Sequence, residues 1–289
     1  MKTLQRVAAE KDAGRKVKYF VRGDMGVSYH QFAALKQREG LSVNGVAVHA
    51  NAILRPGDVV TVRLEEPDRD GVTPDPTPVE VAYEDDDILI IDKCAPLACQ
   101  CSPKQRAMTL ENRLAYRYPG MVFRPLNRLD RGTSGLMAAA RHAHAAQALQ
   151  RQLHTDAFIR EYLAVVEGCM TGSGVIDAPI AKADGATVRR AVDEARGKPA
   201  VTRYCVEAAG EACSLVRLRL ETGRTHQIRV HLAHVGHPIV GDFLYGREDA
   251  RLPQRFALHS AYIRLAHPIT GAVVECRSPL PEALRDLLL

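Results

Sequence analysis

The 289-residue chain contains no tryptophan, and aromatic residues make up only 5% of it. This scarcity speaks against a binding sheet of the RRM type, which stacks RNA bases on aromatic side chains. The chain also lacks any apolar run near the roughly 20 residues needed to cross a bilayer. Its start, MKTLQRVAAEKDAGRKVKYF, mixes charges and has no apolar segment of the signal-peptide kind. We therefore expect no membrane partner.

A disulfide framework is also missing. The seven cysteines are an odd number, and Cys94, Cys99 and Cys101, which lie nearest one another, do not form a CxxC pair. Reduced thiols are the simplest interpretation, because stable disulfides belong to oxidising compartments. We expect a cytoplasmic protein.

The charge balance is mild. Lys and Arg number 39 against 34 for Asp and Glu, a net formal charge of +5, and 46% of the residues are hydrophobic. This is ordinary globular composition. The surplus allows a polyanionic partner without requiring one, so the positions of the arginines decide the matter.

The first 66 residues contain a compact set of local patterns. A helix is predicted over 28–39 with Ser28 as its N-cap, and a tight hairpin at Asn44–Gly45. A further turn follows at Pro56–Gly57. This order of helix, VNG hairpin and PGD turn resembles the small S4-type RNA-binding module, while a generic α+β appendage stays open.

Residues 67–78, PDRDGVTPDPTP, separate this module from the rest. Four prolines with Asp and Gly between them are incompatible with a helix or a central strand. We interpret the segment as a stiff linker at a domain junction, with a surface loop as the alternative.

The remaining residues, 79–289, mix strand patterns with irregularly placed helices. Helices are predicted near 110–118 and 142–153, and SLVRLRLE alternates with Val216 and Leu218 on one face of a strand. Regular βα alternation is absent, so we predict an α+β fold with a mixed, mainly antiparallel sheet.

The stretch RPLNRLDRGTSGLM carries the first candidate chemistry. Asp130 stands between Arg128 and Arg131, two cations that favour its ionised form. The following Gly-Thr-Ser-Gly run, which contains Thr133, lets the backbone approach a ligand and offers amides and hydroxyls to a phosphate. A surface ion pair at a turn is the alternative interpretation.

A second candidate stretch is ETGRTHQIRVHLAHVGHP. Arg224 lies where a strand passes into a predicted helix, a position that suits an anion or a carboxylate, and Arg229 adds polar reach. Ile228, Leu232 and Val235 are predicted to form the buried face of that helix.

Four histidines in this stretch raise the alternative of a zinc site. No Cys or carboxylate completes a known ligand spacing, and the neighbouring arginines repel a cation. We therefore predict no metal and interpret these side chains as hydrogen-bonded or core histidines: His226, His231, His234 and His237.

Taken in order, RLDRGTSGL, REYLAVVEG about 30 residues later and LETGRTHQIRVHLAHVGHPIVGD resemble the RluA-type family of RNA pseudouridine synthases. The resemblance covers residues 80–289, and an S4-like module is a frequent companion in that family. It implies isomerisation of uridine to pseudouridine in structured RNA without a cofactor. The S4-like module favours large-subunit ribosomal RNA over tRNA, and we expect a monomer.

The resemblance also implies roles for individual residues. Asp130 would be the catalytic carboxylate, and Arg224 would pair with it and orient it. Tyr162, by itself an ordinary half-buried strand tyrosine, would pack against the flipped uracil and assist removal of the C5 proton. Arg128 would fill the gap left by the flipped base. The remaining predicted contacts are Arg131, Thr133 and Arg229 for RNA, and Ile228 and Leu258 for the pocket.

Two departures from the family pattern stand out. Asn127 occupies the position where the family usually has His, and DKCAPLACQC replaces a segment of the Asn-Lys-Pro-x-Gly type, with Lys93 retained. Two alternatives to the enzyme stay open. One is a non-catalytic RNA-binding or ribosome-assembly protein with the same fold, and the other is a metal-dependent hydrolase that uses the histidines.

Overall fold

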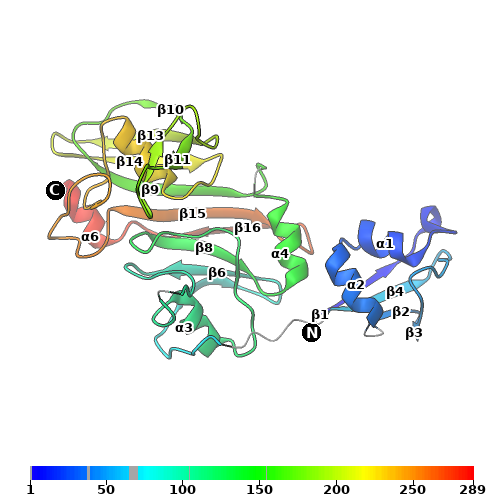
Figure 1. Cartoon of the computed structure of the whole chain (residues 1–289). Helices are drawn as coiled ribbons and strands as arrows, with labels where there is room; N and C mark the ends of the chain where they lie inside the picture. Colours follow the sequence, from blue (N-terminus) through cyan, green and yellow to red (C-terminus); the bar gives the residue numbers. More distant parts are fainter. Residues whose placement is uncertain (1, 38–39, 65–70, 104, 154) are drawn as a thin grey trace.

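The computed structural model describes residues 2–37, 40–64, 71–103, 105–153 and 155–289. Within them the chain builds a four-stranded sheet near the N-terminus and a ten-stranded sheet in the remainder (Figure 1). In the large sheet, β8 and β15 form a parallel pair, whereas the other described pairings are antiparallel. The predicted α+β fold with a mainly antiparallel sheet is therefore confirmed.

The N-terminal sheet has the order β1-β4-β2-β3 and its own hydrophobic core. Ser28 Oγ accepts a hydrogen bond from the Gln31 amide at 3.2 Å, as an N-cap does. Asn44 and Gly45 have φ values of 51° and 80°, which a tight two-residue hairpin turn requires. The sequence patterns missed the first strand and the first helix. The elements are β1 (Lys2–Val7), α1 (Val17–Gly23), α2 (Tyr29–Gln37), β2 (Leu41–Val43), β3 (Val46–Ala47) and β4 (Val59–Leu64).

Two sequence predictions fall partly outside the described residues: 38–39 at the end of the predicted helix, and 67–70 of the predicted linker. Residues 71–78 contain no helix or strand. They lie against α3 (Leu110–Arg117). Asn112 Nδ2 donates to Thr73 O at 2.7 Å, and the Asp75 amide donates to Asn112 O at 3.0 Å.

The large sheet is covered on both faces, which explains the continuous apolar run ILII in one of its central strands. Ile88 and Ile90 pack in the cluster that includes α4 (Ala143–Gln150), while Leu89 and Ile91 pack in the cluster that includes α3. Strands covered on both faces lose the alternation of half-exposed strands.

The sheet order is β10-β13-β14-β9-β15-β8-β6-β5, with β16 beside β15 and β7 beside β8. A short hairpin, β11–β12, stands apart from it. The strands are β5 (Glu80–Glu84), β6 (Ile88–Lys93), β7 (Arg124–Pro125), β8 (Ser134–Ala140), β9 (Ile159–Glu167), β10 (Ser173–Asp177), β11 (Ile180–Lys182), β12 (Arg190–Val192), β13 (Val201–Ala209), β14 (Cys213–Leu220), β15 (Leu258–Ala266) and β16 (Val273–Arg277).

The helices of this part begin and end at local signals. Thr109 caps α3 by accepting from the Asn112 amide at 3.3 Å, and His142 Nδ1 caps α4 by accepting from the Ala145 amide at 3.1 Å. The third helix, α5 (Gln227–His234), ends one residue before Val235. Val235 is 39% exposed, so its prediction as a buried residue is wrong. The C-terminal helix is α6 (Glu282–Arg285). No described helix is long and apolar enough for a membrane span.

The parallel contact between β8 and β15 depends on Gly135. Its φ is +102°, and a Cβ there would lie 2.3 Å from Ser260 O and 2.7 Å from Ser260 N. On its other side Ser260 pairs with Tyr162 of β9. The close approach at Gly135 therefore brings the turn that precedes β8 next to the middle of β9.

We expect Gly135→Ala to lower the free energy of unfolding by about 3 kcal/mol or more, because it adds a clash with the β15 backbone to a left-handed φ. Gly172→Ala is the matched control, since Gly172 also has a positive φ, +76°, but nothing lies within 4 Å of a Cβ there. It should cost only about 1 kcal/mol. Urea denaturation measures both, and equal losses would contradict the role of close packing.

Candidate active site

The candidate site is a cleft of about 870 Å³ between the turn at 125–131, the strands β9 and β14, and the segment that leads into α5. At its inner end the cleft narrows to a pocket that contains Asp130 and Tyr162, with Ile228 and Leu258. The structure thus brings the predicted catalytic carboxylate, tyrosine and apolar pocket residues together from four separate segments.

Asp130 is held by an ion-pair network with Arg229. Arg229 Nη1 donates to Asp130 Oδ2 at 3.1 Å, and its Nε and Nη2 donate to the two carboxylate oxygens of Asp242, both at 2.7 Å. The side chains of Arg229 and Asp242 are 3% and 0% exposed, whereas that of Asp130 is 28% exposed. The buried Asp242 carboxylate thus neutralises the Arg229 cation inside the protein, and the Asp130 carboxylate faces the cleft.

The electrostatics of Arg229 follow from this geometry. Burial alone would lower the pKa of Arg229, but its bonds to Asp242 and Asp130 outweigh burial and hold that pKa above its ordinary value. The guanidinium also lies over the ring of Phe256, 4.1 Å from the ring centroid. It is a permanently charged, fixed partner for Asp130.

The prediction that Arg224 pairs with Asp130 is therefore wrong. Arg224 Nε donates to Pro199 O at 2.9 Å, and its amide donates to Gln227 Oε1 at 2.9 Å. Its side chain still lines the cleft, so it faces a ligand rather than the carboxylate. The reason is helical geometry, because Arg229 lies on the inward face of α5 and Arg224 precedes that helix.

Two predicted RNA contacts are buried. Arg229 is fully engaged by the two carboxylates, so it has no face open to an RNA phosphate. Thr133 is 1% exposed, and its hydroxyl lines the inner pocket without a hydrogen-bond partner within the described part of the chain. Both were predicted to contact RNA, and their burial limits any such contact to a nucleotide inside the inner pocket, which both residues line.

Tyr162 lies in β9 and is 5% exposed as a residue. Burial raises the pKa of the Tyr162 phenol, and the neighbouring Asn127 and Ser260 partly offset the rise. The hydroxyl is thus a neutral group at neutral pH, placed at the wall of the inner pocket.

His226 and Tyr245 lie at the site although the sequence analysis did not predict them there: His226 was interpreted only as one of four hydrogen-bonded or core histidines, and Tyr245 was not singled out. His226 has a left-handed φ of 59°, and its Nε2 lies 3.8 Å from Asp130 Oδ2. Tyr245 OH accepts from the Arg190 amide at 2.8 Å and lies 2.8 Å from His226 Nδ1. We therefore assign the hydroxyl proton to the Nδ1 contact, which leaves the imidazole proton on Nε2, facing Asp130. Burial lowers the pKa of His226, so the ring is neutral at neutral pH.

Exposed cations stand at the mouth of the cleft. Arg128 and Arg131 are both exposed, and neither pairs with a carboxylate within the described residues. By contrast, Arg217 of β14 pairs with Glu207 and Glu161, and Arg219 pairs with Asp156. The strand arginines are therefore neutralised locally, and the free positive charge gathers beside Asp130.

The two departures from the family pattern have local structural explanations. Asn127 is buried and its Oδ1 accepts from the Ala138 amide at 2.9 Å, so it fixes the start of the catalytic turn to β8. Lys93 is also buried, which lowers its pKa to about 8, and its ammonium donates to the carbonyls of Cys94 and Leu97. Because the Leu97 amide in turn donates to Arg131 O at 2.9 Å, the atypical segment remains attached to the turn.

Both ring nitrogens of His231 are already hydrogen-bonded, so this histidine offers no free ligand to a metal. His231 Nε2 donates to Ala178 O, and its Nδ1 accepts from the Thr202 hydroxyl, both at 2.9 Å. A separate cluster of Asp85, Asp87 and His267 has the composition of a metal site. There, His267 Nδ1 accepts from the Ile269 and Thr270 amides, so Nε2 carries the proton and donates to Asp85. The geometry is that of hydrogen bonds between His and Asp.

Comparison with known proteins now identifies the class. Residues 87–234 match the family model of RNA pseudouridylate synthases. A Pasteurella multocida protein named ribosomal large subunit pseudouridine synthase D is 38% identical over 264 residues, which covers 85% of this chain and 81% of that protein. A Bacillus subtilis protein named as an uncharacterized RNA pseudouridine synthase is 39% identical over 254 residues, 86% and 83% of the two chains.

A solved structure agrees with this. Human RNA pseudouridylate synthase domain containing 1 superposes with a TM-score of 0.57 at 29% identity, over 70% of this chain and 83% of that one. The chain belongs to the RNA pseudouridylate synthase family. It is an RNA pseudouridine synthase, an isomerase that acts on uridine within RNA.

The Arg229 network leads to a testable expectation. Arg229→Lys keeps the charge but loses the two-pronged contact with Asp242, so we expect the free energy of unfolding to fall by about 1–3 kcal/mol and the rate of pseudouridine formation to fall about tenfold or more. Arg217→Lys is the control, because its exposed ion pairs should contribute less than about 1 kcal/mol. Urea denaturation measures the stability of both variants, and initial rates measure their activity. Equal losses in Arg229→Lys and Arg217→Lys would refute the role of the network.

The buried histidines predict acid sensitivity. Burial lowers the pKa of His226, His231 and His259, so the unfolded chain takes up protons that the folded chain does not as the pH falls below about 6.5. We expect the urea midpoint to decrease between pH 7.5 and pH 5.5, a window above the carboxylate pKa values. His231→Gln should reduce that decrease, and an unchanged pH dependence in this variant would contradict the assignment.

Proposed function

We propose that this enzyme isomerises uridines of large-subunit ribosomal RNA to pseudouridine, with Asp130 as its catalytic carboxylate. The observation that carries the assignment is the position of Asp130: one oxygen is fixed by a buried guanidinium, and the carboxylate faces the inner pocket opposite Tyr162. Ribosomal RNA is favoured because several relatives bear the name ribosomal large subunit pseudouridine synthase D.

The reaction breaks the N1–C1′ bond of uridine, rotates the uracil and forms a C5–C1′ bond, while C5 loses a proton and N1 gains one. Neither redox equivalents nor an external energy source is needed. A carboxylate can serve this reaction as a nucleophile or as a base towards the sugar, and both roles require the ionised form. The charge of Arg229 stabilises that form.

The pocket residues suit a flipped base. A target uridine in folded RNA must leave its stack, which costs a few kcal/mol. Ile228 and Leu258 supply apolar surface for the uracil, and Tyr162 supplies an aromatic face with a neutral hydroxyl that can take part in proton movement at C5.

The exposed arginines suit the RNA around that base. Arg128 stands at the edge of the pocket, where a planar cation can occupy the space of the flipped base and contact phosphate. Arg131 and Arg224 extend the cationic rim. Residues 1–66 would act as an S4-like module that adds RNA-binding surface beyond the linker. We further propose that the enzyme acts as a monomer in the cytoplasm, where ribosomal RNA is located.

The decisive variant is Asp130→Asn, which removes the charge with almost no change in shape. We expect it to abolish pseudouridine formation, measured as tritium release from RNA labelled at C5 of uridine, and to change the dissociation constant for RNA by less than about threefold. Asp156→Asn, a change at a 98% exposed carboxylate, is the control and should retain activity.

An active Asp130→Asn enzyme would sink the catalytic assignment. Loss of RNA binding in that variant, with a folded protein, would instead favour a mere binding role for the carboxylate. The substrate itself is tested by mapping pseudouridine in ribosomal RNA from cells with and without the gene. Sites that change only in tRNA would refute the proposed target.

A further inference from the structure

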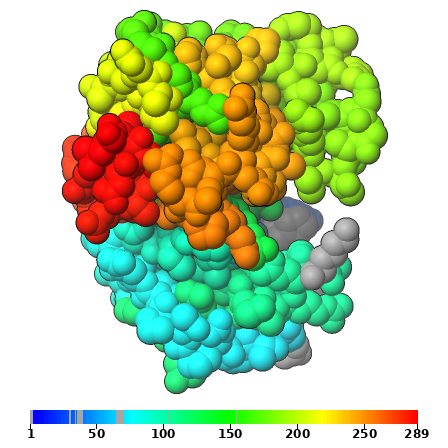
Figure 2. All heavy atoms as spheres, turned by 90° about the vertical axis from the view of Figure 1, so that its left-hand side faces the viewer, coloured from blue at the N-terminus to red at the C-terminus, as the bar shows by residue number. Residues whose placement is uncertain are grey.

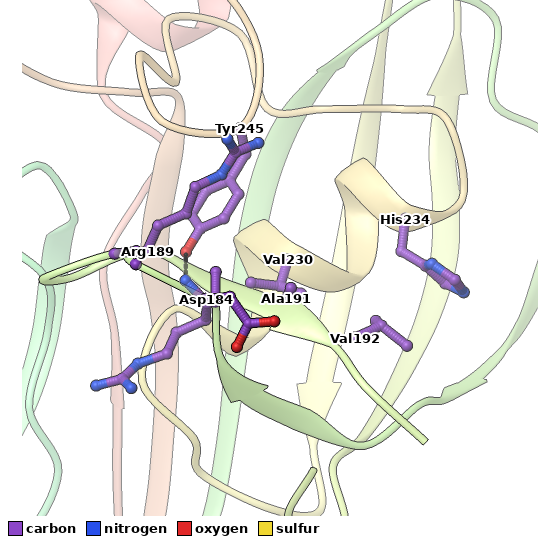
Figure 3. Close-up of a pocket in the computed structure, with 11 residues that line it drawn as sticks. Asp184, Arg189, Ala191, Val192, Val230, His234 and Tyr245 are labelled. Atoms are coloured by element: carbon purple, nitrogen blue, oxygen red, sulfur yellow. Dashed lines mark hydrogen bonds between the residues drawn. The ribbon is translucent and has the colours of Figure 1, made fainter. Parts of the chain in front are cut away.

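A second pocket, of about 510 Å³, lies outside the catalytic cleft. It is formed by the β11–β12 hairpin, the outer side of α5 and Tyr245 (Figure 3). The hairpin segment, in yellow-green, projects at the upper right of the face shown in Figure 2. Nothing in the proposed chemistry of Asp130 uses this pocket.

Positive charge surrounds the second pocket. Arg189 and Arg190 supply this charge, and Arg189 is exposed, while the exposed His234 adds a polar edge. The acidic side chain among its lining residues, Asp184, is neutralised by Arg196, whose Nη1 lies 2.8 Å from Asp184 Oδ1. The rim is therefore cationic overall and suits an anionic ligand.

One donor in this rim lacks an acceptor. Arg190 Nε is buried and has no hydrogen-bond partner within the described part of the chain, although the Arg190 amide is bonded to Tyr245 OH. A buried N–H without an acceptor is costly, so the Arg190 side chain gains by turning towards the pocket when a phosphate oxygen is there to accept from it.

The floor of the pocket is apolar. Val192 and Val230, which belong to one hydrophobic cluster, line it together with Ala191. Above them the Tyr245 ring and the Arg189 guanidinium lie beside each other, with 5.9 Å between Arg189 Cζ and the ring centroid (Figure 3). An apolar floor with an aromatic ring and a planar cation at its side is the combination that binds unpaired nucleobases.

Tyr245 also connects this pocket to the catalytic cleft. Its hydroxyl lies 2.8 Å from His226 Nδ1, and His226 lines the inner pocket beside Asp130. The two cavities are therefore neighbours, separated by the contact between Tyr245 and His226.

We propose that the second pocket binds an unpaired nucleotide of the same RNA that carries the target uridine. The base lies on the Val192–Val230 floor, and the phosphate contacts Arg189 and Arg190. This subsite rests on the proposed function for its substrate class. It would select RNA whose strand is unpaired at the target and at a nearby position.

The test measures binding of the full-length protein to a fluorescein-labelled oligouridylate of about ten nucleotides by fluorescence anisotropy. Arg189→Glu should weaken binding about tenfold or more. Lys198→Glu is the matched control, because Lys198 is an exposed cation after the same hairpin that does not line the pocket, and it should change binding less than about threefold. Equal losses would overturn the proposal in favour of a general basic surface.

A second variant distinguishes binding inside the pocket from attraction to its positive charge. Val192→Lys adds a positive charge but fills the floor, so a purely electrostatic surface would bind the oligonucleotide more tightly, whereas an occupied pocket would bind it more weakly. We expect weaker binding at an unchanged melting temperature. Tighter binding would overturn the proposal, and so would binding equal to that of the unaltered protein.

The same variants also distinguish this subsite from the proposed function. With ribosomal RNA from cells that lack the gene, Arg189→Glu should raise KM for pseudouridine formation more than it lowers kcat. If the unaltered enzyme forms no pseudouridine in that RNA, the proposed function is wrong. The oligouridylate binding measurements then still test whether the second pocket binds a nucleotide. If the unaltered enzyme forms pseudouridine and Arg189→Glu leaves KM unchanged, the proposed subsite is wrong and the proposed function stands.

Discussion

The buried charge of Arg229 is the constraint on which the site depends. A guanidinium in the interior must be neutralised and hydrogen-bonded, and Asp242 does this with two short contacts from a fully buried position. The third contact goes to Asp130, so the catalytic candidate is held by a group that cannot move away. Three segments, the turn before β8, α5 and the loop after Val240, are thereby fixed to one another.

The sheet supplies the second half of the arrangement. Because Gly135 has no side chain, β8 approaches the backbone of β15 at Ser260, and Ser260 also pairs with Tyr162 of β9. The carboxylate that precedes β8 and the tyrosine in the middle of β9 therefore meet at one place. Helices on both faces bury these strands and keep the geometry rigid.

The charge distribution explains how a nearly balanced protein can bind RNA. Arginines of strand β14 are paired with carboxylates, and the charge of Arg229 is neutralised inside the site. Arg128, Arg131 and Arg224 remain around the cleft, and Arg189 and Arg190 around the second pocket. The net surplus of +5 thus says little, since what an RNA strand meets is the local charge of these two openings.

The sequence by itself determined the local features: the cap at Ser28, the Asn44–Gly45 turn, and a carboxylate at Asp130 in a glycine-rich turn. These depend on hydrogen bonds and backbone preferences within a few residues. The partner of Asp130 was decided only by the tertiary structure. Arg224 and Arg229 are equivalent by residue type, and the pair that forms spans 99 positions of the chain. It forms because the packing of α5 against the sheet turns Arg229 inward, a long-range effect that no local pattern encodes.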